Sequence, residues 1–193
     1  MIRVCVVDDH PALRTGLWTV IRSEPGMVFE GSASGADEAF ELIGQVRPDV
    51  VLVDYQLPKE DGLLLCQRLK ALRDPPKVLV YSAYSDSALA IPALLAGADG
   101  MVSKAAPADE LLDTIRRVAR GRTALPPISP ALIGASAAKL DPEDVPIFSM
   151  MMDSTSLSQV AEVMGVEEGE LSAHLRAILG KLKVQTPKAR LRG

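Results

Sequence analysis

The sequence predicts an α/β protein, a doubly wound five-stranded parallel sheet of flavodoxin-like type followed by a small all-α domain. Over residues 1–120, short β-branched apolar runs alternate with longer amphipathic stretches. This alternation is typical of a parallel sheet that helices cover on both faces. After residue 140 the pattern is helical, with no strand-like run. A length of 193 residues suits one ordinary domain and one small domain.

Each element of the first domain follows from its own local pattern. The strands are expected where apolar runs are bounded by turn or charged residues, at Arg3–Val7, Met27–Gly31, Asp49–Val53, Lys77–Tyr81 and Gly100–Val102. The helices are expected where apolar residues recur at helical spacing, at Leu13–Arg22, Ala36–Val46, Leu63–Leu72, Ala88–Leu95 and Ala108–Arg120. Five strand–helix units in about 120 residues fit a small doubly wound domain.

The pattern dissolves between residues 121 and 139, where three prolines and several small residues predict a linker that ends in a short helix. We therefore divide the chain into a domain at 1–120, a linker at 121–139 and an all-α domain at 140–193. The tail helices are expected at Glu143–Met152, Leu157–Met164 and Glu168–Leu182, with a short helix after Pro187. Gly165 is the expected turn between the second and third of these helices.

Composition excludes several classes of protein. Hydrophobic residues make up 48% and charged residues 24% of the chain, which is typical of a globular protein and not of a disordered one. No apolar run approaches the roughly 20 residues of a membrane-spanning helix, and the N-terminus does not resemble a signal peptide. We expect a cytoplasmic protein with no membrane partner. The net charge of −4 gives no indication of nucleic-acid binding.

Polar side chains follow four of the predicted strands. Asp8 and Asp9 end the first, Asp54 the third and Ser82 the fourth, and Lys104 follows the fifth. Because the carboxyl ends of parallel strands converge at one edge of a sheet, these side chains should form one cluster. Clustered carboxylates repel one another unless a cation neutralises them, and their hard oxygens suit Mg²⁺. A carboxylate beside such an ion, a lysine and a hydroxyl is placed to attack a phosphoryl group.

Each of these residues also has a structural interpretation. Asp8 and Asp9, which precede Pro11, equally suit a helix N-cap, and Lys104 taken alone suits a solvated lysine. The two histidines, His10 and His174, have no nearby Cys or second His. We therefore expect both of them to be structural and not metal ligands. The ordered set of polar residues at successive strand ends favours the functional interpretation of the cluster.

Four motifs carry a family resemblance. They are VVDDHP at 6–11, VDYQLPKEDG at 53–62, LVYSAYS at 79–85 and GADGMVSK at 97–104. Together they resemble the receiver domain of a two-component response regulator, a phosphoacceptor and not a conventional enzyme. The resemblance implies that Asp54 accepts a phosphoryl group from a cognate histidine kinase. It also implies that Mg²⁺ is held by Asp8, Asp9, Asp54 and the backbone carbonyl of Gln56. In the same way it implies that Ser82 and Lys104 contact the phosphoryl group.

One position departs from the receiver pattern. Receivers usually carry Tyr or Phe three residues before the lysine, where its inward rotation reports phosphorylation, but this chain has Met101. Methionine fills space but makes no hydroxyl hydrogen bond. Tyr84 is the alternative moving aromatic, although it equally suits a surface tyrosine.

The tail resembles the LuxR-type helix-turn-helix of the NarL/FixJ subfamily over residues 140–184, because its apolar framework has the expected spacing. The resemblance implies DNA binding by a recognition helix at Glu168–Leu182. The expected DNA contacts are Ser172, Arg176, Lys181 and Lys183. The charge pattern disagrees, since residues 140–184 hold eight acidic and three basic residues. Affinity for DNA rests largely on Lys and Arg that neutralise phosphates.

Two hypotheses follow. The first is a response regulator that is phosphorylated on Asp54 and controls transcription through its helix-turn-helix. The second is a phosphorylation-gated regulator whose helix-turn-helix has lost DNA binding and contacts another protein. A homodimer is compatible with both. The acidic residues Glu167, Glu168 and Glu170 favour the second hypothesis, and the intact apolar framework favours the first.

Overall fold

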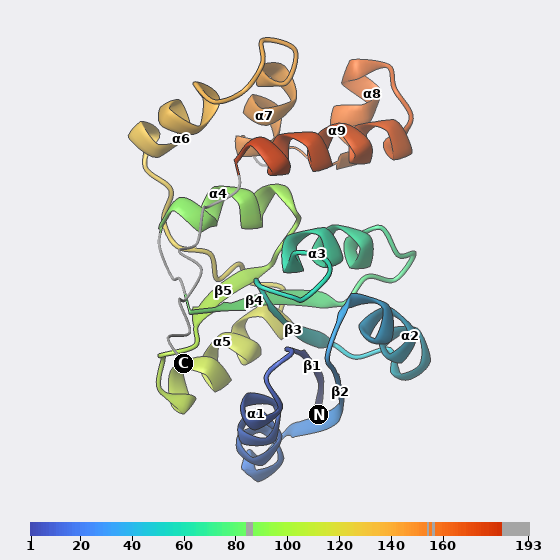
Figure 1. Ribbon diagram of the computed structural model, residues 1–193, viewed down its shortest axis with the longest axis vertical. Helices are drawn as coiled ribbons and strands as arrows, with labels where there is room; N and C mark the ends of the chain where they lie inside the picture. The colour runs from blue at the N-terminus through green and yellow to red at the C-terminus, as the bar shows by residue number, and fades with distance from the viewer. Residues whose placement is uncertain (84–86, 154, 156, 183–193) are drawn as a thin grey trace, which may run out of the picture. The chain divides into compact units, whose positions relative to one another are not determined.

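Five parallel strands form a single sheet in the order β2-β1-β3-β4-β5 (Figure 1). The strands are β1 (Ile2–Val7), β2 (Met27–Ala33), β3 (Val50–Asp54), β4 (Lys77–Ser82) and β5 (Gly100–Ser103). This computed structural model describes residues 1–83, 87–153, 155 and 157–182. The expected doubly wound parallel sheet is confirmed. β2 runs two residues further than its apolar pattern indicates, because Ser32 and Ala33 pair with Val6 and Val7 of β1.

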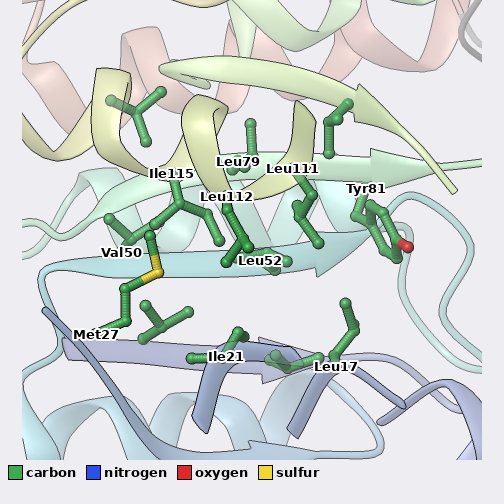
Figure 2. Packing of buried hydrophobic residues seen from close by; sticks show 14 of the residues in the cluster. Leu17, Ile21, Met27, Val50, Leu52, Leu79, Tyr81, Leu111, Leu112 and Ile115 are labelled. Atoms are coloured by element: carbon green, nitrogen blue, oxygen red, sulfur yellow. The ribbon is translucent and has the colours of Figure 1, made fainter. Parts of the chain in front are cut away.

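Helices cover both faces of the sheet, as Figure 1 shows: α1 and α5 lie on one face, and α2, α3 and α4 on the other. Their bounds are α1 (Pro11–Ser23), α2 (Ala36–Val46), α3 (Gly62–Lys70), α4 (Ser87–Leu95) and α5 (Ala108–Ala119). β1 is buried on both faces, and its Val4 and Val6 belong to the core beneath α1 and α5. Leu17 and Ile21 of α1 and Ile115 of α5 pack into this core (Figure 2). Each fully buried side chain of this size contributes about 1.5–3 kcal/mol of hydrophobic stabilisation.

The segment after α5 returns to the sheet beside β5. Gly121, with a φ of 75°, turns the chain, and the amide N–H of Ala124 then donates to the carbonyl of Asp99 at 2.8 Å. The amide of Met101 in turn donates to the carbonyl of Ala124 at 3.0 Å. Ala124 is buried, so the first residues of the predicted linker belong to the core of the sheet domain.

The chain divides into two compact units between Ile128 and Ser129, so the division falls inside the predicted linker. The second unit holds α6 (Pro130–Ala137), α7 (Val145–Met152), α8 (Leu157–Met164) and α9 (Glu168–Lys181). α6 is the short helix expected at the end of the linker. α7 begins two residues later than predicted, so that Pro146 lies in its first turn, where a missing N–H leaves no hydrogen bond unmade.

α8 and α9 are separated by a turn at Gly165, whose φ is 67°. Val160, Ala161, Leu171, Leu175 and Ile178 form the buried framework of these two helices, in agreement with the predicted helix-turn-helix. The expected short helix after Pro187, together with Tyr84 and Lys183, lies outside the described residues. Every helix in the described part of the chain is too short or too polar to cross a membrane.

Candidate functional site

The carboxyl ends of β1, β3 and β5 bring a lysine between two buried carboxylates. Lys104 Nζ lies 2.6 Å from Asp8 Oδ2 and 2.7 Å from Asp54 Oδ2. Asp8 follows β1, Asp54 ends β3 and Lys104 follows β5, so residues up to 96 positions apart meet at one edge of the sheet. The cluster expected from the strand ends is therefore present as a set of contacts.

Local backbone geometry holds Asp8 in place. Asp8 is fully buried, and its Oδ1 accepts a hydrogen bond from the amide of His10 at 2.8 Å. The guanidinium of Arg14 donates to the backbone carbonyl of Asp8 at 2.6 Å. Both carboxylate oxygens of Asp8 thus have partners within the protein, since Oδ2 is paired with Lys104. His10 itself is the N-cap residue of α1, and no described side chain makes a capping hydrogen bond there, so the interpretation of Asp8 and Asp9 as helix caps is wrong.

Asp54 lies at the floor of the cluster and is 3% exposed. Its Oδ1 accepts from the amide of Gln56 at 3.2 Å. Burial raises the pKa of Asp54 above its usual value, and the ammonium of Lys104 only partly offsets this effect. For Lys104, burial lowers the pKa, but the hydrogen bonds that its ammonium donates to Asp54 and Asp8 outweigh burial and leave the pKa raised. The site therefore keeps a charged lysine next to a carboxylate that is costly to ionise without a further cation.

A cavity of about 600 Å³ opens above this carboxylate. Its lining residues are His10, Ala12, Leu13, Asp54, Gln56, Ser82, Ala83 and Lys104. Ser82, at the end of β4, is buried, and its backbone carbonyl accepts from the amide of Lys104 at 2.8 Å. A small residue at Ala83 and a hydroxyl at Ser82 leave both space and a polar group beside the carboxylate of Asp54.

The carboxylates offer ligand atoms for a divalent cation. Asp8, Asp9, His10 and Asp54 each provide a ligand atom, and these atoms lie within 4.8 Å of one another. Asp9 Oδ1 is buried and lies 2.7 Å from the ring nitrogen of His10. Oxygen ligands of this kind fit Mg²⁺. The backbone carbonyl of Gln56, in the turn after Asp54, remains a predicted further ligand.

We expect the Asp54→Asn variant of the metal-free protein to gain stability over wild type as the pH rises. Because the pKa of Asp54 is raised in the folded state, the folded protein holds this proton more tightly than the unfolded chain does. The free energy of unfolding therefore falls as the pH rises from about 3.8, the ordinary pKa of an aspartate, through the folded-state pKa. Asn has no carboxyl group to titrate, so the stability of the variant lacks this pH dependence. Denaturant unfolding of both proteins in EDTA across this pH interval measures the difference, and a difference that shrinks with rising pH would contradict the burial effect.

The candidate switch position, Met101, is half-buried on β5. Its amide is bonded to Ala124, so the main chain links this strand directly to the segment that follows α5. A role for Met101 in reporting phosphorylation stays a prediction, and Tyr84, the alternative, lies outside the described residues.

In the second unit, the predicted DNA-contact residues differ in their surroundings. Ser172 is half-buried and Arg176 is exposed on α9. Lys181, near the end of α9, instead forms ion pairs with the carboxylates of Asp141, at 2.6 Å, and Asp144. Asp144 is only 2% exposed, and these two carboxylates raise the pKa of Lys181. The charge of Lys181 is thus already balanced inside the unit, whereas that of Arg176 faces solvent.

This difference predicts that alanine substitutions of Arg176 and Lys181 affect different properties, DNA binding in the first case and stability in the second. Arg176→Ala should weaken DNA binding and lower the slope of log affinity against log salt by about 1, since one phosphate contact is lost. Lys181→Ala should leave that slope nearly unchanged and lower the thermal unfolding midpoint of the second unit, because the buried Asp144 loses its cation. Fluorescence anisotropy over a salt series and thermal unfolding measure the two effects. A lower slope for Lys181→Ala would show that the lysine leaves its carboxylates to bind DNA.

Sequence reasoning missed the surroundings of three residues of these sites. The ring nitrogen of His10 lies 2.7 Å from Asp9 Oδ1, and the position of this histidine directly after two aspartates is the signal for that contact. Asp144 was counted only as an unfavourable charge, and no local pattern shows that it is buried. Gly62 lies one residue before the predicted helix at Leu63–Leu72, whereas in the structure it begins α3 directly against the backbone of Asp54.

Comparisons with known proteins agree with this arrangement. Residues 4–116 match the family model of the response regulator receiver domain. The nitrate/nitrite response regulator protein NarL of Escherichia coli (strain K12) is 26% identical over 194 residues, covering 95% of this chain and 90% of that protein. The DNA-binding transcriptional activator DevR/DosR of Mycobacterium tuberculosis (strain ATCC 25618 / H37Rv) is 28% identical over 195 residues, covering 96% and 90%.

Solved structures agree as well. The response regulator ChrA of a heme-sensing two-component system has a TM-score of 0.55 and 29% identity, covering 96% of this chain and 92% of that chain. A LuxR-family two-component response regulator from Aurantimonas sp. SI85-9A1 has a TM-score of 0.62 and 31% identity, covering 69% and 94%. The chain therefore belongs to the response regulator family, with a receiver domain at residues 4–116 and similarity over 95% of its length to the NarL/LuxR-type transcriptional regulators.

Proposed function

We propose that this response regulator accepts a phosphoryl group on Asp54 from the phosphohistidine of a cognate histidine kinase and thereby controls DNA binding by its helix-turn-helix. The observation that carries the proposal is Lys104 Nζ held between Asp8 and Asp54 at the base of an open cavity. Catalysis of phosphoryl transfer consists largely of positioning and charge neutralisation, and this arrangement provides both.

In the transfer, a carboxylate oxygen of Asp54 attacks phosphorus and forms an acyl phosphate. The bond between phosphorus and the kinase imidazole breaks, and its electron pair returns to the ring nitrogen. Lys104 turns from the carboxylates towards a phosphoryl oxygen, and the hydroxyl of Ser82 donates to another. When bound, Mg²⁺ would supply positive charge to the transferring oxygens, and its proposed ligands are Asp8, Asp9, Asp54 and the backbone carbonyl of Gln56.

The output is assigned to α8 and α9. Their apolar framework is that of a helix-turn-helix, and relatives that cover 95% or more of the chain include a protein named as a DNA-binding transcriptional activator. Exposed Glu167, Glu168 and Glu170 at the start of α9 repel the phosphate backbone and neutralise no phosphate, so they should make binding weak and lower its dependence on salt. The hypothesis of a helix-turn-helix converted to a protein-interaction module is not favoured by these relatives.

The experiment is fluorescence anisotropy of the full chain with mixed genomic DNA fragments over a salt series. It is run with Mg²⁺, with and without a beryllofluoride mimic of the phosphoryl group. We expect salt-dependent binding that the mimic strengthens, and no such strengthening in Asp54→Asn, which lacks the acceptor carboxylate. Absence of binding at low salt by a folded second unit would overturn the DNA part of the proposal and leave phosphorylation of Asp54 to be judged by direct labelling.

A further inference from the structure

We infer that residues 122–125, the docked segment that follows α5, form a positioning element for phosphoryl transfer. By docking on β5, this segment holds Lys104 in the place where it meets the phosphoryl group. The inference rests on the proposed function and deepens it, because it concerns the control of the same lysine and the same acceptor, Asp54. It makes the start of the linker part of the phosphoryl-transfer site.

β5 is a short strand at the edge of the sheet. It has four residues, Gly100–Ser103, and it pairs along one side with β4. On its other side, among the residues that the structure describes, its only bridge joins Gly100 to Ala124 of the docked segment. An edge strand has unpaired N–H and C=O groups along its open side and is therefore less firmly held than a central strand. The docked segment supports the strand that leads to Lys104.

Two backbone hydrogen bonds fasten the docked segment to β5. The amide of Ala124 donates to the carbonyl of Asp99 at 2.8 Å, and the amide of Met101 donates to the carbonyl of Ala124 at 3.0 Å. The segment is also tied to α5, where the amide of Arg122 donates to the carbonyl of Arg117 at 3.1 Å. Ala124 is buried, so water competes poorly for both hydrogen bonds to β5. The contact thus joins α5, the start of the linker and the edge strand.

Two small residues permit this close approach. A Cβ added at Gly100 would lie 2.9 Å from Ala124 Cβ, which is closer than two such atoms can pack. It would also lie 3.0 Å from Leu79 Cδ1 and 3.1 Å from Val118 Cγ1. Glycine on the strand and alanine on the segment therefore let the two backbones come within hydrogen-bond distance. A methyl group at position 100 should push the segment off the strand.

Asp99 fixes the start of β5 on the side of β4. Its carboxylate accepts hydrogen bonds from Lys70 Nζ at 2.7 Å, Lys77 Nζ at 3.0 Å and the amide of Val78 at 2.9 Å. Its backbone amide donates to the carbonyl of Val78 at 2.8 Å, and its carbonyl accepts from Ala124. Asp99 is therefore held from both sides, and loss of the docked segment removes one of the two supports.

The opposite end of β5 leads directly to Lys104. The amide of Lys104 donates to the carbonyl of Ser82 at 2.8 Å, and its ammonium contacts Asp8 and Asp54. Lys104 is five positions after Asp99, so about 17 Å of extended chain joins the docked end of the strand to the lysine. A paired strand of this length is stiff and passes a shift at one end to the other. Small shifts matter here, because a displacement of about 1 Å slows a positioned reaction by about 100-fold.

Coupling through β5 is reciprocal. Docking of the segment favours the position of Lys104 that meets the phosphoryl group, so the phosphoryl group favours docking by the same free energy. The start of the linker is therefore held most firmly when Asp54 is phosphorylated. This route uses main-chain hydrogen bonds and needs no aromatic side chain, in agreement with Met101 at the usual aromatic position.

The test compares Gly100→Ala with the double variant Gly100→Ala/Ala124→Gly in the full chain. Gly100→Ala should lower the initial rate of labelling by a small phosphodonor in Mg²⁺ by at least about tenfold. The double variant removes the clash between the two Cβ atoms and should recover most of the rate, and Ala124→Gly alone completes the cycle. Met27→Ala is the matched control, because it removes a buried side chain from β2, the opposite edge strand. It should lower the stability of the same unit and be labelled as fast as wild type while folded.

Two spectroscopic measurements read docking and the lysine separately. In wild type, the amide of Met101 should exchange with solvent more slowly when the beryllofluoride mimic is bound, a measurement that needs no variant. In Gly100→Ala the same amide should exchange faster than in wild type. The ¹⁵N signal of the Lys104 ammonium, recorded without a phosphodonor, should shift in Gly100→Ala and return towards its wild-type position in the double variant.

Unchanged labelling in a Gly100→Ala protein whose Met101 amide exchanges rapidly would overturn the inference, since the segment would then have left the strand without effect on Lys104. A lost rate that the double variant does not recover would overturn it as well, and so would a Met101 amide whose exchange the mimic does not slow although the mimic binds. Absence of both labelling and mimic binding in wild type would instead overturn the proposed function. The Lys104 signal of the variants would in that case still decide whether the docked segment positions the lysine.

Discussion

Asp54→Asn is expected to abolish formation of an acyl phosphate on this protein. Asn has the shape of Asp but lacks the anionic oxygen that attacks phosphorus, and an amide is a far weaker nucleophile. Asp54 is also the carboxylate that Lys104 contacts at the end of β3, with its side chain 4% exposed inside the cavity. Labelling with a radioactive small phosphodonor in Mg²⁺, followed by hydroxylamine treatment to cleave acyl phosphates, measures the effect.

Asp74→Asn is the matched control, since it removes an exposed carboxylate between α3 and β4. It should be labelled as well as wild type. Hydroxylamine-sensitive label that persists in Asp54→Asn would place the acceptor on another carboxylate, with Asp8 and Asp9 as the first to be replaced. A folded Asp54→Asn protein, checked by circular dichroism, is the condition for either conclusion.

Gly62→Ala is expected to be the most damaging single-methyl substitution near the site. A Cβ at position 62 would lie 2.0 Å from the backbone oxygen of Asp54 and 3.0 Å from Val53 Cγ1. A backbone oxygen cannot rotate away as a flexible side chain can, so the end of β3 must move. Overpacking of this kind costs about 1–3 kcal/mol of stability or more. Displacement of the acceptor carboxylate by about 1 Å should slow phosphorylation by about 100-fold.

Denaturant unfolding and the initial rate of labelling with a small phosphodonor measure the two effects of Gly62→Ala. Gly16→Ala is its control, because Gly16 is an exposed residue of α1 with no atom within 4 Å of the added Cβ. It should be slightly stabilising, by about 0.5–1 kcal/mol, as expected for Gly to Ala within a helix. Normal labelling of Gly62→Ala would show that the β3 end tolerates the shift and that the position of Asp54 is less constrained than its contacts indicate.

The elements of the sheet domain were predictable because the residue pattern within each one reflects which of its faces are buried. β1, β3 and β4 are buried on both faces and read as continuous apolar runs, and α5 shows its buried side as Leu111, Leu112 and Ile115 at helical spacing. Element ends were less predictable. α7 begins at Val145 and not at Glu143 because Pro146 is accommodated only in a first helical turn, which the apolar pattern alone does not show.

The candidate phosphoacceptor site was predictable for a different reason. Asp8, Asp54 and Lys104 each follow a strand, and the topology of a parallel sheet brings strand ends together whatever the residues between them. The order of the motifs along the chain was therefore sufficient to expect the cluster. The distances between these three side chains, their ion pairs and the hydrogen bonds to both oxygens of Asp8 were not predictable, because they depend on the packing of side chains from three strands.

The sequence by itself determined the two-part organisation, the doubly wound sheet, the helix-turn-helix framework and the residues of the acidic cluster, since all of these follow from periodicity and from the ends of strands. Only the tertiary structure decided that His10 joins the carboxylates, that Gly62 lies against Asp54 and that Lys181 is paired with Asp144 rather than left to solvent. Asp144 and Lys181 are 37 residues apart. The physical reason is that these contacts join residues far apart in the chain, and no periodic pattern in the sequence relates such residues to each other. Only the packed structure therefore shows which charges are already balanced and which remain available for a ligand.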